Sequence, residues 1–281
     1  MSDERYTVIL GDRRYAVHRN WARLPAGQEF GFLSDLSVDG DGHVHVAQRG
    51  TDRPVLVFDR EGRNIGAWGE GVLAEPHYIT RGADGTFLVA DRDAHQVLRF
   101  DGAGTLLQAL GRRHWPSLGA PFNHPTAAAL ASDGEIYVAD GYGNSHVHRF
   151  GADGRLLQSW GGPGTGPGAF TTPHAVVIDR RGRVLVGDRE NNRVQLFDRD
   201  GRFLTEWGDF YHPMQIWIDD RDLVFVTDQI PRISLMTLDG ELVGRCRGAI
   251  NGAHGLAGDA EGNLYLAELP PQEITKLERL S

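Results

Sequence analysis

The sequence has little of several features that would place it in other classes of protein. Cys246 is its single cysteine, so no disulfide can form within the chain, which is compatible with a reducing compartment. No apolar run approaches the roughly 18 residues that a membrane-spanning helix requires. Residues 1–6 carry charges and no apolar segment, so we expect no signal peptide and a cytoplasmic location.

Positive charge is also scarce. The chain has 29 lysines and arginines against 38 aspartates and glutamates, which gives a formal net charge of −9. Because a nucleic-acid-binding surface must neutralise phosphates, we expect no nucleic-acid partner, and we also expect no membrane partner.

Glycine, by contrast, is abundant. The chain contains 37 glycines, which suit many tight turns, and 40% of its residues are hydrophobic, which is ample for a core. At 281 residues the chain could form two ordinary domains or one large all-β domain.

One unit recurs six times along the chain. In its clearest copy, residues 173–189, two short apolar stretches flank the turn sequence Asp-Arg-Arg-Gly, which predicts a β-hairpin. Further hairpins are predicted at residues 33–48, 76–91, 125–140, 213–228 and 253–268. A third and a fourth strand follow most of them, so each unit is four antiparallel strands over about 40–50 residues, as in a β-propeller blade.

We therefore predict an all-β fold, a six-bladed β-propeller with four antiparallel strands per blade, formed by residues 1–281 as one domain. The predicted blades span approximately residues 30–69, 75–111, 123–161, 171–208, 211–248 and 251–281. The sixth copy ends after its third strand, whereas a spare strand at Tyr15–Trp21 resembles the fourth strands of other copies. Residues 1–24 are thus expected to complete the last blade and close the ring.

These repeats resemble the NHL family, whose members form six-bladed propellers, and the resemblance covers almost the entire chain. Because propellers host many activities, this resemblance predicts the fold rather than the function. A non-catalytic NHL interaction module is therefore one alternative.

Histidine recurs at one aligned position in alternate blades. The innermost strand of each blade lines the central channel, and its residues at this position are Ser34, His77, Thr126, His174, Met214 and His254. Alternate blades of six are related by about 120°, so the three imidazoles are expected to converge on the channel axis. Three neutral imidazoles with an open fourth position are typical of catalytic metal sites. Imidazole suits Zn, Fe, Co, Cu and Ni, and the residues alone do not choose among them.

The second strand of each hairpin returns to the end of the channel where the histidines are expected. In most blades it ends in an acid, which can accept backbone N–H bonds in the turn that follows. Arg92 and Arg189 follow two of these acids, and they either pair with acids or present their guanidinium groups to a substrate carboxylate. Tyr142 follows a third acid. Beside a metal its phenol could act as a general base, and the alternative is a packed aromatic side chain.

A narrower resemblance runs from about Pro76 to the C-terminus and is strongest from Phe122 to Phe197. The segments Asp140-Gly-Tyr-Gly-Asn-Ser, Pro173-His174 and Asp188-Arg-Glu-Asn191 are similar to those of peptidylglycine α-amidating lyase. This family of six-bladed propellers cleaves peptidyl-α-hydroxyglycine to peptide amide and glyoxylate.

Residue by residue, the resemblance implies that His77, His174 and His254 hold zinc, that Tyr142 is the catalytic base and that Arg189 is an active-site arginine. The implied mechanism is that the metal polarises the carbinol oxygen, Tyr142 removes its proton, the C–N bond breaks and an arginine holds the carboxylate.

The sequence departs from this family at two places. The family has an aspartate, associated with structural calcium, directly after the last histidine, and Gly255 stands there, so calcium is not expected at that position. An arginine of the family's first blade has no clear counterpart, and Arg49 is the candidate substitute. We expect Arg49, Arg92 and Met214 to border the substrate.

The main functional prediction is a metal-dependent lyase that cleaves a C–N bond of an α-hydroxyglycine or a related carbinolamide, with a small-molecule or peptidyl substrate that carries a carboxylate. The second is a metal-dependent hydrolase, hydratase or isomerase that uses the same histidines. The link at residues 111–123 is either a lid over the channel mouth or a surface loop. Four other histidines alternate along predicted strands and are expected on sheet surfaces: His43, His45, His146 and His148.

Overall fold

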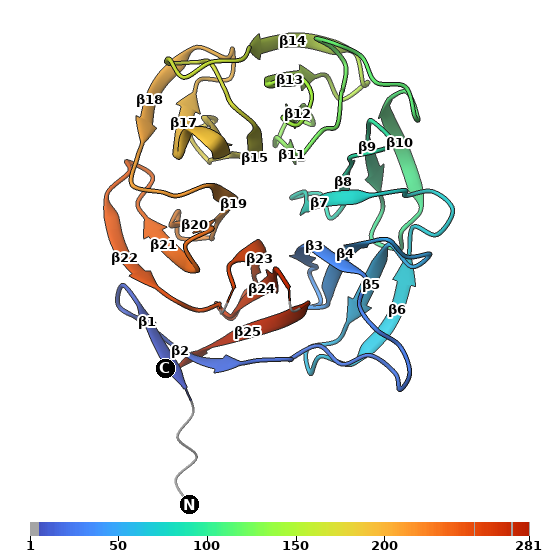
Figure 1. The fold of residues 1–281 in the computed structure, drawn as a ribbon, viewed down its shortest axis with the longest axis vertical. Coiled ribbons are helices and arrows are strands. Elements are labelled where there is room, and N and C mark those ends of the chain that lie inside the picture. Colours follow the sequence, from blue (N-terminus) through green and yellow to red (C-terminus); the bar gives the residue numbers. More distant parts are fainter. Residues whose placement is uncertain (1–5, 250, 271, 281) are drawn as a thin grey trace, which may run out of the picture.

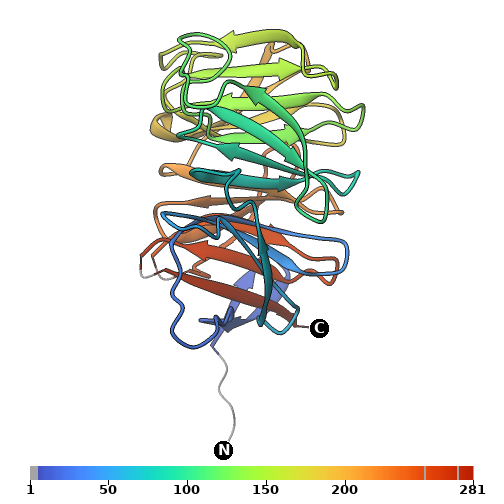
Figure 2. The same cartoon turned by 90° about the vertical axis from the view of Figure 1, so that its right-hand side faces the viewer.

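Six β-sheets surround a central axis in the manner of propeller blades (Figure 1). The structure, a computed structural model, describes residues 6–249, 251–270 and 272–280. Seen from the side, the ring is a disc, with the blades next to one another around its axis (Figures 1 and 2). The predicted all-β, six-bladed architecture is confirmed.

Blades 1 to 3 are four-stranded antiparallel sheets whose first strand lies innermost (Figure 1). Their strands are β3 (Phe32–Val38), β4 (Val44–Arg49), β5 (Val55–Phe58), β6 (Asn64–Trp68), β7 (Pro76–Arg81), β8 (Phe87–Asp91), β9 (Gln96–Phe100), β10 (Leu106–Gly111), β11 (Ala127–Leu130), β12 (Ile136–Asp140), β13 (His146–Phe150) and β14 (Leu156–Gly161).

Blades 4 and 5 repeat this arrangement, and blade 6 takes two strands from the N-terminal part of the chain. Their strands are β15 (Pro173–Ile178), β16 (Val184–Asp188), β17 (Arg193–Phe197), β18 (Phe203–Trp207), β19 (Pro213–Ile218), β20 (Val224–Asp228), β21 (Arg232–Met236), β22 (Leu242–Cys246), β23 (Ala253–Gly258), β24 (Leu264–Glu268), β25 (Glu273–Leu280), β1 (Thr7–Leu10) and β2 (Arg13–His18). A short 3₁₀ helix, η1 (Arg189–Asn191), follows β16.

The hairpin turns form because their first aspartate holds the backbone of the turn. In blade 4, Asp179 Oδ1 accepts hydrogen bonds from the backbone N–H groups of Arg181, at 2.9 Å, and Arg183, at 2.8 Å. Gly182 adopts a φ of +77°, which a residue without Cβ reaches at no steric cost. The predicted Asp-Arg-Arg-Gly turn thus brings two buried strands into register.

The N-terminal strand closes the ring as predicted. In blade 6, β2 pairs antiparallel with β25, and Tyr15, fully buried, lies opposite Arg279. The observed strand starts earlier than the predicted one and ends at His18, and Trp21 packs beyond it against Tyr265. Strand β1, which was not predicted, adds a fifth strand to this sheet and buries Leu10.

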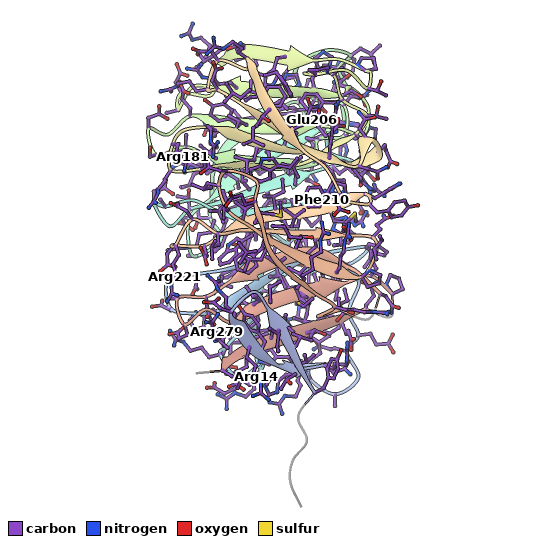
Figure 3. All side chains as sticks on the ribbon, turned by 90° about the vertical axis from the view of Figure 1, so that its left-hand side faces the viewer. Arg14, Arg181, Glu206, Phe210, Arg221 and Arg279 are labelled. Atoms are coloured by element: carbon purple, nitrogen blue, oxygen red, sulfur yellow. The ribbon has the colours of Figure 1, made fainter. Side chains whose placement is uncertain are left out.

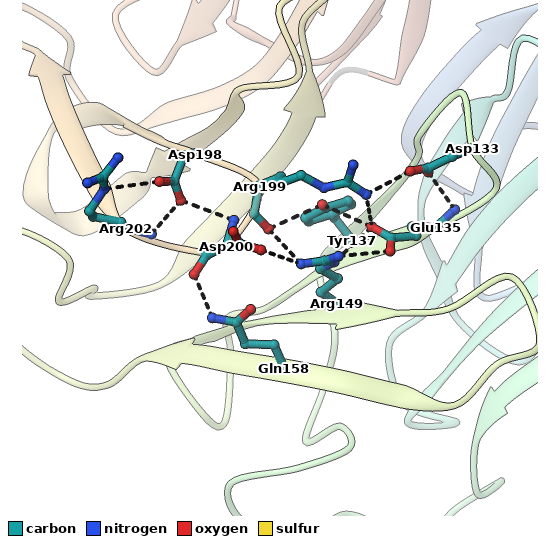
Figure 4. Close-up of polar contacts among 9 residues, drawn as sticks. All are labelled: Asp133, Glu135, Tyr137, Arg149, Gln158, Asp198, Arg199, Asp200 and Arg202. Carbon is teal, nitrogen blue, oxygen red and sulfur yellow. Dashed lines mark hydrogen bonds and ion pairs between the residues drawn. The ribbon is translucent and has the colours of Figure 1, made fainter.

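Ion pairs across the blade boundaries add to the apolar contacts between sheets. Between blades 3 and 4, Glu135 accepts a two-pronged contact from Arg149, and Arg199 of the next blade reaches both Glu135 and Asp133 (Figure 4). Arg149 also pairs with Asp200 at 2.8 Å. This network joins two hairpin turns that are far apart in sequence.

Two of the histidines expected on sheet surfaces are buried instead. His148 is fully buried, with Nε2 3.1 Å from Asp140 Oδ2 and Nδ1 2.7 Å from Ser159 Oγ. His45 is 3% exposed and contacts Trp68 Nε1 at 3.0 Å. The prediction was wrong because, in a propeller, both faces of a middle strand are covered by neighbouring blades, so strand alternation does not mark an exposed face.

Within the described ranges, the structure contains no helix whose length and apolar character would let it cross a membrane.

Candidate metal and active site

Three histidines occupy the same place on the innermost strands of blades 2, 4 and 6. His77, His174 and His254 are each the second residue of their strand, and in each case the pairing with the second strand is interrupted at that residue. Such an interruption, a β-bulge, re-aims the side chain of the unpaired residue. The predicted alternation of blades therefore brings the three imidazoles to one end of the channel.

The three imidazoles lie close enough to share one ion. One nitrogen from each ring lies within 4.8 Å of the others. Ring centroids are 4.9 Å apart for His77 and His174 and 5.2 Å apart for His174 and His254. All three side chains are buried, His77 and His174 completely. The convergence predicted from the repeat is thus present.

A hydrogen bond from each Nδ1 fixes the orientation of its ring. His77 Nδ1 lies 2.8 Å from the carbonyl oxygen of Thr126, and His174 Nδ1 lies 3.0 Å from that of Met214. His254 Nδ1 lies 2.5 Å from the carbonyl oxygen of Ser34. Because a carbonyl only accepts, Nδ1 carries the proton in each ring, and Nε2 keeps its lone pair for a ligand.

These three carbonyls belong to the aligned position in the other three blades. The sequence repeat aligns Ser34, Thr126 and Met214 with the histidines. They contribute to the site through their main-chain carbonyl groups, which accept the Nδ1 hydrogen bonds, and not through their side chains. Sequence could not show this, because any residue type supplies a carbonyl oxygen.

Burial keeps the three imidazoles neutral. It lowers the pKa of His77 and His174 well below the ordinary value, and charge repulsion by neighbouring imidazoles adds to the effect. Burial lowers the pKa of His254 to about 3. Neutral imidazole is the form that binds metals.

Tyr142 completes the site from blade 3. Its hydroxyl lies 3.0 Å from His77 Nε2 and 3.0 Å from His174 Nε2. The side chain is 40% exposed, while its hydroxyl faces the buried imidazoles. Burial raises the pKa of the phenol, and the positive charges of Arg189, Arg92 and Arg49 oppose this rise. The proposed base therefore lies at hydrogen-bond distance from two candidate ligands.

Two glycines allow the Tyr142 segment to pack this closely. A Cβ on Gly141 would lie 2.0 Å from the carbonyl oxygen of Pro173, the residue before His174. A Cβ on Gly143 would lie 2.3 Å from Asn123 Cγ. The Gly-Tyr-Gly sequence is thus required by close approach of the backbone to neighbouring segments.

The three predicted arginines lie around Tyr142 and differ in their hydrogen-bond partners. Arg92 forms two hydrogen bonds to Asp93, at 2.6 and 3.0 Å, and its guanidinium carbon lies 5.9 Å from the Tyr142 ring centroid. Arg49 stacks on Phe32, and its buried Nε has no hydrogen-bond partner among the described residues. Within the same part of the chain, Arg189 Nε is also buried without a hydrogen bond, although it lies 3.5 Å from Glu190 Oε1 in an ion pair.

The strand-end acids fasten turns rather than neutralise these arginines. Asp91 accepts hydrogen bonds from the backbone N–H groups of Ala74 and Glu75, and Asp188 accepts one from that of Thr171. The acids that pair with these arginines are instead Asp93, for Arg92, and Glu190, for Arg189.

A second layer of side chains, which was not predicted, fills the channel beneath the imidazoles. Tyr78 packs against all three histidines, with ring centroids 4.8 to 5.2 Å away, and its hydroxyl donates to the Met214 carbonyl at 2.6 Å. Asp35 and Gln215 lie in the same layer, joined at 3.1 Å. Each is the residue after the aligned position in its blade, which is the signal that could have found them.

The donor set fits a zinc-type ion and does not fit calcium. Three neutral Nε2 atoms held by outer hydrogen bonds are a typical zinc ligand set. Calcium needs six to eight oxygen ligands. The Asp35 carboxylate instead faces N–H donors from Ile79 and Gln215, and a Cβ on Gly255 would lie 2.4 Å from its Oδ1. Asp35 thus fills the space that a larger residue at Gly255 would take.

Two other predicted features lie beside the site without reaching its centre. The buried Met214 side chain contacts Gln229, and the residue serves His174 through its carbonyl. The link at 111–123 is tied down by hydrogen bonds from His114 N–H to the Ala94 carbonyl and from Gly119 N–H to Asn144 Oδ1. Trp115 and Leu118 of this link are exposed.

Comparison with known proteins is consistent with this fold. A family model for the NHL repeat matches residues 122–150 and 170–197. The chain is 33% identical over 236 residues to NHL repeat-containing protein 3 of Mus musculus, which covers 72% of this chain and 66% of that protein. Two solved structures share the fold at low identity. One is a gluconolactonase from Xanthomonas campestris, with TM-score 0.72, 16% identity and coverage of 96% of this chain and 91% of that chain. The other is a streptogramin B lyase, with TM-score 0.69, 13% identity and coverage of 97% and 100%.

Fold and site together define the chain as a six-bladed β-propeller with a buried cluster of three histidines, and part of it matches the NHL repeat. Within this class its sequence is similar to amidating lyases. It is 28% identical over an alignment of 326 residues to the probable peptidyl-alpha-hydroxyglycine alpha-amidating lyase of Caenorhabditis elegans, covering 99% of this chain and 92% of that protein. It is 35% identical over 159 residues to peptidylglycine alpha-amidating monooxygenase of Rattus norvegicus, covering 52% of this chain and 16% of that protein.

Proposed function

We propose that this protein is a metal-dependent lyase that cleaves the C–N bond of an N-acyl or peptidyl α-hydroxyglycine. The observation that carries the proposal is the contact of the Tyr142 hydroxyl with Nε2 of His77 and of His174, each at 3.0 Å. This contact supports the proposal because the reaction needs a proton-transfer group beside a metal ligand set, and the phenol touches two of the three neutral imidazoles. Similarity to proteins named as amidating lyases supports the same reaction.

The arginines around Tyr142 orient the substrate in this proposal. Arg49 and Arg189 have buried Nε atoms without hydrogen bonds among the described residues, so both can donate to an incoming carboxylate, which at Arg189 competes with Glu190 at 3.5 Å. Arg92 is already engaged by Asp93 and acts mainly through its charge. The substrate carboxylate thus lies toward Arg49 and Arg189, with the carbinol hydroxyl toward Tyr142.

Tyr142 moves the proton. It removes the proton from the carbinol hydroxyl, the C–O bond becomes a C=O bond, and the electron pair of the C–N bond leaves with nitrogen. Return of the proton from Tyr142 to nitrogen gives the amide and glyoxylate, so atoms and charge balance. The three arginine charges favour the phenolate that this step needs.

A zinc-type ion bound by His77, His174 and His254 would supply a Lewis acid for the carbinol oxygen and a positive charge beside Tyr142. The buried Tyr78 closes the channel beneath the imidazoles and keeps bulk water from that side of the site.

The test is glyoxylate release from an N-benzoyl-α-hydroxyglycine substrate by protein whose metal content is measured by elemental mass spectrometry. Wild type is expected to hold about one transition metal per chain and to release glyoxylate and benzamide in equal amounts. His174→Ala is expected to lose both metal and activity. His146→Ala, which alters a histidine outside the cluster, serves as the matched control and should keep both.

Metal-loaded wild type that releases no glyoxylate would overturn the lyase proposal and move the hydrolase, hydratase and isomerase alternatives forward. Wild type that binds no added metal would overturn the metal site itself and favour a binding module.

A further inference from the structure

A second hollow lies at the end of the channel opposite to the histidines. It has a volume of about 320 Å³ and is lined by residues from all six innermost strands. The histidines are the second residues of these strands, whereas this cavity is formed near the strand ends that lead into the hairpin turns. In Figure 3 the labelled Arg181 and Arg221, which lie in two of these turns, mark this face of the disc.

The channel is closed between the two ends. Tyr78, Asp35 and Gln215 occupy its middle, and Gln215, which is 8% exposed, borders the cavity while it donates to Asp35. A molecule in this cavity therefore has no open path to the imidazoles. The cavity is a separate site rather than an extension of the candidate active site.

The last residues of the six innermost strands show one departure from an apolar ring. At this position the chain has Val38, Arg81, Leu130, Ile178, Ile218 and Gly258. Five of the six are aliphatic or glycine, and Arg81 of blade 2 is the exception. An aliphatic residue would pack equally well at this position, so what the arginine adds is its charge and its hydrogen-bond donors.

The preceding residues show a second departure, on the opposite blade. At this position the chain has Ser37, Thr80, Ala129, Val177, Trp217 and Ala257. Trp217 of blade 5 is the single large aromatic, and Gly258 makes room for it, because a Cβ there would lie 2.4 Å from the Trp217 ring. Blades 2 and 5 face each other across the channel, so a cation and an aromatic ring border one cavity from opposite sides.

Arg81 is free to bind an anion. Across residues 6–249, 251–270 and 272–280 it has neither a hydrogen bond nor an ion pair, although the chain has a net charge of −9 and most of its hairpin turns carry aspartates. No acidic residue lines the cavity among the described residues. A guanidinium without a partner, beside an acid-free hollow that aliphatic side chains and Trp217 border, is complementary to a carboxylate or sulfonate on an apolar body.

We propose that this cavity is a second ligand site, which binds a small monoanion with an aromatic or branched aliphatic body. Its anionic group pairs with Arg81 and its body packs against Trp217 and the aliphatic strand ends. This inference does not depend on the proposed lyase activity, because none of its residues touches the histidines or Tyr142.

The test is calorimetric titration of the full chain with 2-naphthoate and with its neutral counterpart 2-naphthamide. Wild type is expected to bind naphthoate more tightly than naphthamide. Arg81→Gln is expected to weaken naphthoate binding about tenfold, the loss of one charge-assisted pair, and to leave naphthamide binding unchanged. Val177→Trp, which fills the cavity, is expected to abolish binding of both.

Two matched variants complete the design. Arg221→Gln, on the same face but outside the lining, should bind naphthoate like wild type. Arg189→Gln removes a cation at the histidine end and should also leave this binding unchanged. Three results would overturn the proposal. They are loss of naphthoate binding in Arg189→Gln, unchanged naphthoate binding in Arg81→Gln, and no naphthoate binding by wild type at millimolar concentration. Because Arg81 is exposed, Arg81→Gln keeps the test valid even where Val177→Trp fails to fold.

Discussion

The Nδ1 of His254 lies 2.5 Å from the carbonyl oxygen of Ser34, although 220 residues separate them in sequence. Blade 6, which is completed by β2, thereby meets blade 1 inside the candidate site. The joint that closes the ring is therefore also one of the three hydrogen bonds that orient the imidazoles. Stability of the ring closure and integrity of the site are physically linked.

The first prediction follows from this joint. Deletion of residues 1–24 removes β2, its five paired positions with β25 and the buried Tyr15. We expect the melting temperature to fall by roughly 10–15 °C, or cooperative unfolding to be lost, because several kcal/mol of buried contacts disappear. Deletion of residues 1–11, which removes β1 alone, should have a smaller effect in the same calorimetric scan. Equal melting temperatures for full-length and 25–281 protein would contradict the assigned role of β2.

The second prediction concerns Tyr142. Tyr142→Phe removes the hydroxyl that lies 3.0 Å from two imidazoles and should lower kcat for glyoxylate release by about 10²–10⁴. Metal content should stay near wild type, since the three histidines are untouched. Tyr211→Phe, at an exposed tyrosine, is the control and should behave like wild type. Full activity of Tyr142→Phe would exclude the phenol as the base.

A third prediction tests whether close backbone packing at Gly141 is required for activity, by comparing alanine substitutions at a crowded and at an open glycine. Gly141→Ala would place a Cβ 2.0 Å from the Pro173 carbonyl oxygen and must displace the Tyr142 segment. We expect at least a hundredfold loss of kcat/KM, because small misplacement of a catalytic group has large effects. Gly208→Ala, where no atom lies within 4 Å of the added Cβ, should leave kcat/KM unchanged. Similar kinetics for both variants would show that the Tyr142 segment tolerates displacement.

The fourth prediction is a dependence of stability on pH. The Arg149 guanidinium, together with Arg199, lowers the pKa of Glu135 from 4.5 to about 2 (Figure 4). Because the folded-state pKa is depressed, the stabilisation is complete above pH 4.5 and is lost as the pH falls from 4.5 toward 2.

Glu135→Gln should therefore lower the free energy of unfolding at pH 7 by about 1 kcal/mol, and its difference from wild type should shrink below pH 4.5. Denaturant melts at several pH values measure this. High salt should also reduce the difference, because the network is near the surface. A constant difference from pH 7 to pH 2.5 would argue against the ion-pair explanation.

Much of the fold and of the metal ligand set could be predicted because both depend on a repeat. The spacing of turns fixed the hairpins, and the histidines at 77, 174 and 254 stood at one position of that repeat. Tyr142 was identified because other blades have arginine or glutamine near this position and because its segment resembles the lyases, and the contacts at Gly141 explain why that motif is informative.

The parts that could not be predicted depend on contacts that residue types do not encode. The acceptors for the imidazoles are main-chain carbonyls, including that of Ser34, so no side chain marks them. The burial of Asp35 could not be predicted, because its carboxylate accepts from a backbone N–H group, which any residue type can supply. His148 was wrongly predicted to lie on a sheet surface. It is buried because neighbouring blades cover both faces of its strand, and this follows only from the assembled ring.

Imidazole donors and carbonyl acceptors alternate from blade to blade around the channel, and this alternation defines the smallest repeating unit of the site. Each imidazole is in one blade and the carbonyl that orients it is in the next, so one complete ligand unit needs two blades. A ring with an odd number of blades would leave one imidazole beside another without a carbonyl between them. The site is thus a trimer of blade pairs closed on itself, and a gene that tandemly repeats residues 76–170 three times is the natural starting point for building a threefold-symmetric version of it.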